Sequence, residues 1–238
     1  MSEARAQILA GIRRSLKRGR LESAREAELR ERVAGHPRKL VPARATTLDH
    51  SSRTDLFVAM AEEVQATVAQ VNSSAAVPDE VARYLAAENL PAELIIAPDP
   101  SLDEMPWSER PLLRIRRGRA DANDAVSLTP CDVAIAETGT LMLSSGAATP
   151  TTLNFLPDTH IVVVHGNQVV ATYEDGWDRL RSGGMMPRAI NFITGPSRTG
   201  DIEQRIELGA HGPRRLHIIL VDDRLVDDRQ KAGDGQSK

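Results

Sequence analysis

Two uninterrupted apolar runs constrain the fold more than any other feature of this chain: Ile-Val-Val-Val at residues 161–164 and His-Ile-Ile-Leu-Val at residues 217–221. A strand with one face in water alternates apolar and polar residues, whereas a strand covered on both faces is apolar throughout. The runs therefore predict central strands of a sheet with a layer packed on each side. Only 3% of the residues are aromatic, so the core has to be built from Val, Ile, Leu and Ala.

Further short runs predict strands around these two. Together the predicted strands lie at residues 93–97, 112–115, 125–128, 133–136, 140–143, 160–164, 169–173, 190–193 and 216–221. The runs at 133–136 and 140–143 are close enough to pair as a hairpin. Apolar residues at three- and four-residue steps predict a helix at 55–71, and a proline followed by acidic residues predicts another near 78–85. This order of elements predicts an α/β fold with a mixed sheet flanked by helices.

The first 44 residues have a different character. Apolar residues recur at helical spacing over residues 3–18, and residues 21–33 are rich in Glu and Arg, so two helices and then a Gly- and Pro-containing linker are predicted. The segment carries a net charge of +7, which leaves −10 on the remainder for an overall −3. We expect a basic helical arm and linker at 1–44, an α/β domain at 45–226 and a disordered tail at 227–238.

The basic arm allows two interpretations. Clustered Arg and Lys attract nucleic acid, but acidic residues are interspersed among them and no aromatic residue lies between them. That pattern favours a helix that contacts solvent or a protein partner. Self-association through the apolar face of these helices is one form of such contact.

Cysteine content and hydropathy exclude several classes of protein. A single cysteine, Cys131, excludes an internal disulfide and any iron–sulfur or zinc site built from several cysteines of this chain. No apolar run approaches the roughly 20 residues that cross a bilayer, and charged residues interrupt the first 16 before a signal-peptide core could form. We therefore expect a cytoplasmic protein.

The stretch at residues 189–201 is the first candidate for ligand binding. An apolar run of strand length ends at a Gly-Pro pair, side chains that bind anions follow, and a helix is predicted at 201–207. Free N–H groups of its first turn and the guanidinium of Arg198 would bind phosphate or carboxylate. The alternative is a capped helix whose arginine is solvated. The residues expected to contact the anion are Gly195, Ser197, Arg198, Thr199 and Asp201.

The second candidate is Glu-Thr-Gly-Thr at residues 137–140, directly after a predicted strand. Ligands of open α/β sheets bind beyond the carboxyl ends of the strands. Glu137 is a candidate nucleophile, general base or hydrogen-bond acceptor, with Thr138, Gly139 and Thr140 contacting the ligand. The alternative is a hairpin turn whose Glu and Thr side chains cap backbone groups.

The third candidate is the glycine-containing loop at 208–215. His211 is a candidate for ligand contact or proton transfer, and Gly212 lets the backbone approach a ligand; the alternative is a loop histidine bonded to backbone. His160 and His165 flank a predicted core strand and are expected to be structural. Without a His-x-x-x-His pair or a cysteine cluster no metal site is expected, and Cys131 is expected to be a small buried side chain.

Four motifs in this order resemble the LUD-domain family, in particular its lactate-utilization branch. They are Ala-Ile-Ala-Glu-Thr-Gly-Thr-Leu at 134–141, Leu-Pro-Asp-Thr-His-Ile-Val-Val-Val at 156–164, Ile-Thr-Gly-Pro-Ser-Arg-Thr-Gly-Asp-Ile-Glu at 193–203 and Leu-Gly-Ala-His-Gly-Pro-Arg-Arg-Leu-His-Ile-Ile-Leu-Val at 208–221. The resemblance covers roughly residues 50–222. It implies the NagB/RpiA/CoA-transferase-like fold, which is Rossmann-like, and a part in bacterial oxidation of L-lactate to pyruvate beside separate iron–sulfur subunits.

Three functional hypotheses follow. The first is an accessory or regulatory component of lactate oxidation that binds a small anion, holds no cofactor itself and has iron–sulfur subunits as partners. The second is an enzyme of CoA-transferase-like, phosphosugar or folate chemistry that uses Glu137, assisted by His211. The third is nucleic-acid binding through the basic arm.

Overall fold

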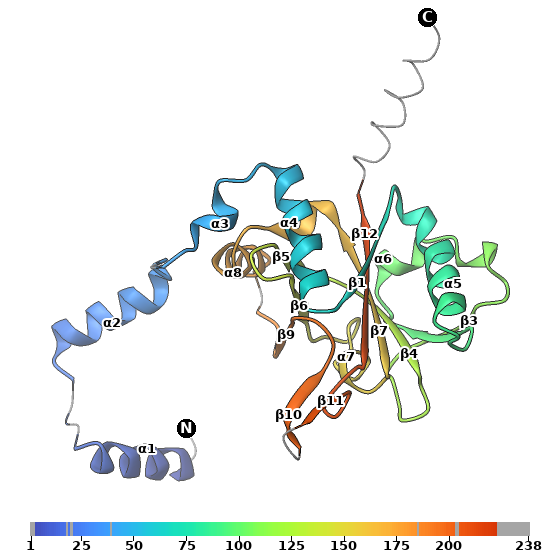
Figure 1. The fold of residues 1–238 in the computed structure, drawn as a ribbon. Coiled ribbons are helices and arrows are strands. Elements are labelled where there is room, and N and C mark those ends of the chain that lie inside the picture. Colours follow the sequence, from blue (N-terminus) through green and yellow to red (C-terminus); the bar gives the residue numbers. More distant parts are fainter. Residues whose placement is uncertain are drawn as a thin grey trace, which may run out of the picture. The chain divides into compact units, whose positions relative to one another are not determined.

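The computed structural model describes residues 3–17, 19, 21–38, 40–184, 186–202 and 205–222, with only the backbone described at 201, 202, 205 and 206. Its contacts divide the chain into two units, which we call the arm (Met1–Val41) and the body (Pro42–Lys238). Figure 1 labels the elements of both units. The tail predicted at 227–238 lies outside the described residues.

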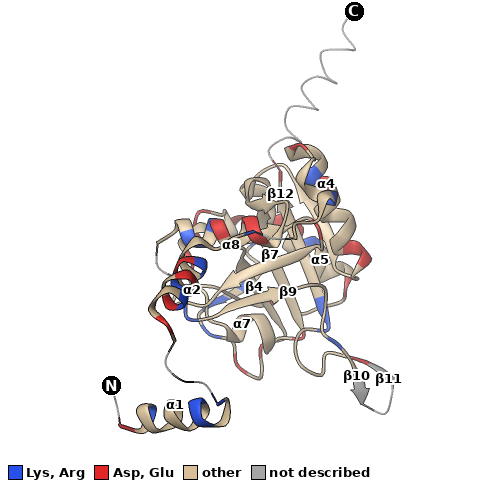
Figure 2. Cartoon of the chain, turned by 90° about the vertical axis from the view of Figure 1, so that its left-hand side faces the viewer, with Lys and Arg blue, Asp and Glu red and all other residues tan. Residues whose placement is uncertain are grey.

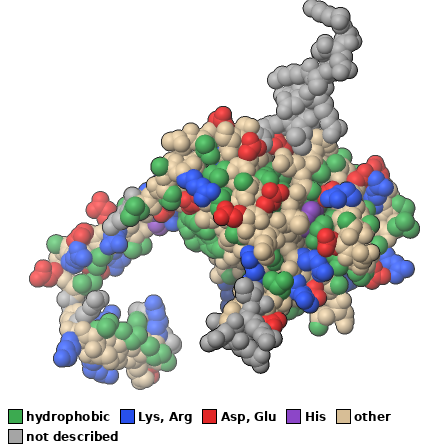
Figure 3. All heavy atoms as spheres, in the orientation of Figure 1, with side chains coloured by type: hydrophobic (Ala, Val, Ile, Leu, Met, Phe, Trp, Pro, Cys, Tyr) green, Lys and Arg blue, Asp and Glu red, His purple; other side chains and the backbone are tan. Residues whose placement is uncertain are grey.

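The arm consists of two helices, α1 (Glu3–Ser15) and α2 (Ser23–Gly35), which confirms the helices predicted there. Among their described residues none is buried. Ion pairs one turn apart, Arg25–Glu28 and Arg30–Glu26, support α2. Apolar side chains gather along α1, where Ile8 is 64% exposed (Figure 3). The arm thus presents an apolar helix face to its surroundings.

The body is built on a central sheet of parallel strands. In the described part of the body these are β1 (Thr67–Val71), β2 (Glu93–Ile96), β3 (Arg114–Arg117), β4 (Val126–Pro130), β7 (Thr159–His165) and β12 (Arg215–Val221). Their order across the sheet is β1-β12-β7-β4-β2-β3. The two continuous apolar runs form β7 and β12, which lie side by side with Val162 opposite Ile218. This confirms them as central strands.

Helices cover one face of the central sheet. They are α5 (Val77–Ala87), α6 (Pro100–Asp103) and α7 (Thr152–Phe155). Val81 and Leu85 of α5 pack with Ile161 and Ile219, which point to this face. Strands β4 and β7 carry no Lys, Arg, Asp or Glu (Figure 2), whereas β3 near the edge carries three arginines. Burial of this apolar surface is the main driving force for the fold.

The opposite face packs against helix α4 (His50–Glu63) and a second sheet. That sheet contains β5 (Val133–Ile135), β6 (Thr140–Ser144), β8 (Val169–Val170) and β9 (Ile190–Ile193) in the order β8-β5-β6-β9. Strands β5 and β6 form the predicted hairpin. Helix α8 (Tyr173–Ser182) covers the outer face of this sheet, against Val133, Ile135 and Met142. Figure 1 shows α4 and α8 on one side of the central sheet and α5 on the other, which confirms the α/β class.

Shorter elements complete the described chain. They are α3 (Ala43–Thr46), β10 (Arg198–Ile202), β11 (Arg205–Leu208) and single 3₁₀ turns at Ser74–Ala76, Trp107–Glu109 and Gly166–Gln168. Strands β10 and β11 pair antiparallel and extend away from the rest of the body (Figures 1 and 2).

A buried polar contact joins α5 to the central sheet. His217 of β12 stacks on Tyr84 with ring centroids 3.9 Å apart, and its Nδ1 lies 2.8 Å from the Thr67 hydroxyl. Its Nε2 lies 3.2 Å from Oε1 of Glu80, whose Oε2 accepts a hydrogen bond from Arg83. Burial alone would raise the pKa of Glu80, but the hydrogen bonds from His217 and Arg83 lower it to about 2. The carboxylate of Glu80 is therefore held in its charged form.

Three boundaries predicted from the sequence were wrong. The helix predicted at 55–71 ends at Glu63, and two residues later Gln65 adopts a positive φ of 69°. Residues 67–71 form β1 instead, because they pair with β12. The strand predicted at 112–115 begins only at Arg114, and Leu112 is 86% exposed. The strand predicted at 169–173 ends at Val170, because Thr172 caps the start of α8.

Candidate functional site

The Glu-Thr-Gly-Thr motif forms the turn between β5 and β6. Gly139 has a φ of +64°, a conformation that side chains rarely adopt. A Cβ atom at this position would lie 2.4 Å from the backbone nitrogen of Ala61, so the turn packs directly on α4. The glycine is thus required for the close approach of two backbones.

A cluster of hydroxyl groups ties this turn to other parts of the body. The Thr140 hydroxyl is 2.7 Å from that of Thr138, 2.9 Å from that of Tyr173 and 2.7 Å from that of Thr194. Thr140 is fully buried. The four hydroxyls largely satisfy one another, as buried polar groups must. Two motifs found in the sequence, at 137–140 and 193–203, therefore meet at this cluster.

Glu137 lies at the start of α8. Its Oε1 accepts a hydrogen bond from the backbone nitrogen of Tyr173 at 3.1 Å, beside the N-cap Thr172 and its partner Asp175. A carboxylate at this place satisfies an N–H that has no partner within the helix and interacts favourably with the helix dipole. This contact matches the capping alternative for Glu137. The second carboxylate oxygen, Oε2, is not used in this contact, so ligand contact by Glu137 stays a prediction.

The Gly-Pro stretch packs on the end of α4. Gly195 has a φ of +75°, and a Cβ there would lie 2.3 Å from the Val64 carbonyl oxygen. Arg198 donates a hydrogen bond from Nη2 to the same carbonyl at 2.7 Å. A cationic side chain on the last carbonyl groups of a helix stabilises that end. Arg198 therefore has a structural contact, while its exposed guanidinium keeps further donors.

The helix predicted at 201–207 was wrong. Residues 198–202 and 205–208 form the hairpin strands β10 and β11, with Arg198 opposite Leu208 and Thr199 opposite Glu207. The described segment therefore has no helical first turn whose free N–H groups could bind an anion. Thr199 is half-buried in β10, and the side chain of Asp201 lies outside the described atoms.

The loop at 208–215 lies against the Ser197 region. The backbone nitrogen of Ser197 donates to the Pro213 carbonyl at 2.8 Å, and that of Gly209 donates to the Ser197 carbonyl at 3.0 Å. A Cβ on Gly212 would lie 3.5 Å from the Ser197 Cβ. His211 is exposed, and no hydrogen bond joins it to Glu137 within the described part of the chain. The fold thus brings Ser197 and Gly212 together, while no hydrogen bond among the described residues links His211 to the β5–β6 turn.

Sequence reasoning missed two members of the hydroxyl cluster, Tyr173 and Thr194. Tyr173 had been placed in a strand, although Thr172 followed three residues later by Asp175 is a capping-box pattern that marks a helix start. Thr194 has no local signal, because its partner Thr140 is 54 residues away.

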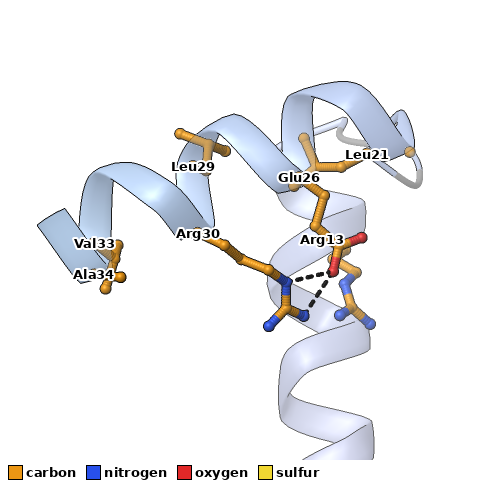
Figure 4. A pocket seen from close by; sticks show the side chains of 8 residues that line it. Arg13, Leu21, Glu26, Leu29, Arg30, Val33 and Ala34 are labelled. Carbon is orange, nitrogen blue, oxygen red and sulfur yellow. Dashed lines mark hydrogen bonds and ion pairs between the residues drawn. The ribbon is translucent and has the colours of Figure 1, made fainter.

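One cavity belongs to the arm. It measures about 980 Å³ and lies between α1 and α2, lined by Arg13, Gly19, Leu21, Glu26, Leu29, Arg30, Val33 and Ala34. Figure 4 shows its side chains, including the hydrogen-bonded pair Glu26 and Arg30. None of these side chains is buried, so we interpret the cavity as an open groove between two helices.

The described residues lack two kinds of feature. They contain no group of three or more His, Cys, Asp or Glu side chains arranged to hold a metal ion. None of their helices is long and apolar enough to cross a membrane.

Two curated relatives illustrate the similarity to known proteins. "Lactate utilization protein C" of Geobacillus sp. (strain WCH70) is 37% identical over 103 residues, which is 42% of this chain and 43% of that protein. The protein of the same name from Deinococcus radiodurans is 39% identical over 142 residues, 58% of this chain and 62% of that protein. The chain thus spans less than two thirds of the length of the curated relatives it matches.

A solved structure and a family model extend the match. The crystal structure of a DUF162 family protein from Deinococcus radiodurans matches this fold with a TM-score of 0.55 and 25% sequence identity. The match covers 73% of this chain and 99% of that protein chain. The model of the LUD domain matches residues 54–221, which include the central sheet, the second sheet and the four motifs. The chain therefore belongs to the LUD-domain family.

Proposed function

We propose that this protein takes part in bacterial lactate utilization as an accessory or regulatory component. The observation that carries the proposal is its similarity to proteins named "Lactate utilization protein C" in several bacterial genera, at 33–39% identity. Two of the family motifs, at 134–141 and 193–203, lie together where the β5–β6 turn, the end of β9 and the start of β10 meet α4.

The oxidation of lactate to pyruvate removes two electrons, and we assign the carriers of those electrons to partner subunits. Iron–sulfur clusters are held by several cysteine thiolates, usually four. This chain has one cysteine. In this proposal, iron–sulfur subunits carry the electrons, and this protein binds the small anion and associates with those subunits.

The ligand in this proposal is a small anion held by side chains rather than by a helix start. Arg198 carries the charge, and its guanidinium can bond a carboxylate or phosphate while Nη2 stays on the Val64 carbonyl. Ser197 directly precedes Arg198 in the chain, and Gly212 lies against Ser197, so both are next to the proposed anion site. Glu137 supports this arrangement by holding α8 to the β5–β6 turn.

Growth on lactate tests the role in lactate utilization. A strain that lacks the gene for this protein is expected to lose growth on L-lactate as sole carbon source and to keep normal growth on pyruvate, because only the oxidation step is affected. A plasmid copy should restore growth. Equal growth of the deletion strain and its parent on L-lactate would reject the proposal.

Calorimetric titration tests the anion site. Replacing Arg198 with alanine is expected to raise the Kd for L-lactate or inorganic phosphate about tenfold, the effect of losing one charge-assisted contact. Arg198→Lys should keep part of the affinity because the charge remains. Arg114→Ala is the matched control, since Arg114 is exposed and paired with Glu93. An unchanged Kd in Arg198→Ala would remove Arg198 from the site.

A further inference from the structure

A second cavity lies beyond the carboxyl ends of the parallel strands, away from the residues discussed above. It measures about 210 Å³. Its walls come from the segments that follow β2, β4, β6 and β7 and from α7; they include Asp99, Leu102, Thr129, Cys131, Asp132, Ser144, Asn154 and His165. Val163 of the motif at 156–164 lines it, whereas none of the candidate ligand-binding residues at 137–140, 195–201 and 211–212 does.

The topology of the sheet marks this place as a binding site. From β2 the chain continues to β3 at one edge, whereas from β4 it continues to β7 on the opposite side, although β2 and β4 are neighbours. Loops that leave adjacent strands in opposite directions open a crevice at their carboxyl ends, and ligands of open α/β sheets bind in that crevice. Asp99 and Leu102 follow β2, and Cys131 and Asp132 follow β4, so the cavity lies in this crevice.

Asn154 is the strongest indication of a ligand. It is 4% exposed and lines the cavity, yet within the described residues its side-chain amide makes no hydrogen bond; only its backbone nitrogen does, to the Thr151 carbonyl. The amide is not among the fully enclosed side-chain groups that lack a partner, so it keeps access to the cavity, where a polar group normally bonds water or a ligand. A buried amide that faces a cavity is a group available to a ligand.

Two carboxylates in the wall determine which ligand chemistry fits. Asp132 accepts the Ser144 N–H through Oδ2, and Asp99 accepts both the N–H and the hydroxyl of Ser101 through Oδ1. Each keeps a second oxygen that can accept a hydrogen bond. No Lys or Arg is among the described residues that line the cavity. The wall therefore favours ligands that donate hydrogen bonds over carboxylates and phosphates.

Several other wall residues are committed or apolar. Gln168 donates to the Cys131 carbonyl and accepts from the His165 backbone nitrogen, while Leu102, Met105 and Val163 supply apolar surface. The Cys131 thiol donates to the Val133 carbonyl, and burial raises the pKa of that thiol well above its ordinary value. Cys131 is therefore a protonated wall residue, and binding here is non-covalent.

We propose that the cavity at the carboxyl ends of β2, β4 and β7 binds a small uncharged or cationic molecule through its hydroxyl or amino groups. The ligand's groups donate hydrogen bonds to the amide oxygen of Asn154 and to the second carboxylate oxygens of Asp99 and Asp132. The apolar part of the wall packs on the ligand's carbon skeleton. The volume is below the roughly 300–1,000 Å³ of pockets for larger ligands, so the molecule is of monosaccharide or diamine size. This site is separate from the proposed anion site at Arg198.

Nuclear magnetic resonance of the ¹⁵N-labelled full chain tests the proposal. Ribose, myo-inositol and 1,3-diaminopropane serve as probes, and L-lactate serves as the anionic comparison. At least one donor probe is expected to shift the amide signals of residues 99–105, 129–132 and 154, whereas L-lactate should leave them unchanged. Asp132→Asn should weaken the diamine more than the polyols, which distinguishes a cationic from a neutral ligand. No shift from any donor probe, or an equal shift from L-lactate, would overturn the proposal.

Asn154→Leu gives a readout that does not require the natural ligand. Because the amide makes no hydrogen bond to the described residues, this variant is expected to leave Tm unchanged or raise it by up to about 4 °C, while it abolishes the probe-induced shifts. Asn123→Leu is the matched control, since Asn123 is exposed and outside the cavity, and it should keep those shifts. A fall in Tm for Asn154→Leu would identify Asn154 as a structural residue and overturn its assigned role.

Discussion

Replacing Gly139 with alanine is expected to lower the free energy of unfolding by about 2–5 kcal/mol, from overpacking together with an unfavourable φ. The new Cβ would lie 2.4 Å from the Ala61 nitrogen and 2.6 Å from the Met60 carbonyl carbon. These are backbone atoms of α4, and the helix cannot shift easily because Phe57 and Ala61 are fully buried in the core. Urea unfolding followed by circular dichroism measures the loss.

Gly184 supplies the matched control for this effect. Its φ is +89°, yet a Cβ there would meet no heavy atom within 4 Å. Gly184→Ala should therefore show only the backbone term, about 1–2 kcal/mol. Gly195→Ala, with a Cβ 2.3 Å from the Val64 carbonyl oxygen, should resemble Gly139→Ala. Equal losses in the free energy of unfolding for Gly139→Ala and Gly184→Ala would show that the turn does not pack closely against the backbone of α4.

The second large effect is expected at Glu80. Glu80→Gln should lower the free energy of unfolding by up to about 3 kcal/mol at pH 7, because the variant loses a buried charge that the native state stabilises. The folded pKa of Glu80 is about 2, against 4.5 for the ordinary group. A lowered folded pKa stabilises the protein above the ordinary pKa, and that stability is lost as the pH falls toward 2.

The difference between the wild type and Glu80→Gln should therefore shrink on acidification, to less than about half its neutral value at pH 3. Urea unfolding of both proteins from pH 7 to pH 3 measures this. Glu93→Gln is the control, because Glu93 and Arg114 form an exposed pair worth less than about 1 kcal/mol. A difference at Glu80 that stays constant with pH would contradict the proposed charge stabilisation.

Much of the architecture could be predicted because it depends on local composition. The apolar runs at 161–164 and 217–221 are β-branched and lack charge, so only positions covered on both faces suit them, and they form the centre of the parallel sheet. The turn between β5 and β6 was predictable for a similar reason, since a glycine separates two short strand-forming runs.

Other elements depend on contacts that no local pattern contains. Residues 64–71 continue the three- and four-residue spacing of α4, but β12, about 150 positions later, recruits residues 67–71 as a strand. In the same way, Arg198 is bonded to the carbonyl of Val64, 134 positions earlier, and this contact accompanies a hairpin where a helix was predicted. Tertiary contacts override propensity at such places.

The candidate sites show the same limit. Glu137, Ser197 and Arg198 stood out because charged and hydroxyl side chains sit beside glycines, a pattern that structural turns share with ligand sites. Asn154 lies in an unremarkable Thr-Leu-Asn-Phe stretch, and only its burial and the missing partner of its amide draw attention to it. Burial is a property of the fold, so a sequence pattern cannot reveal it.

The pairing of β1 with β12 has a consequence for synthesis of the chain on the ribosome. In the central sheet, the first strand has the last strand as its only neighbour, and β12 also separates β1 from β7. Until residues 215–221 have left the ribosome, β1 has no strand to pair with and α4 lacks part of the surface it packs on. We therefore expect the body to complete its fold only after residues 215–221 have emerged, and chains that stop before residue 215 to expose an unpaired, aggregation-prone strand edge.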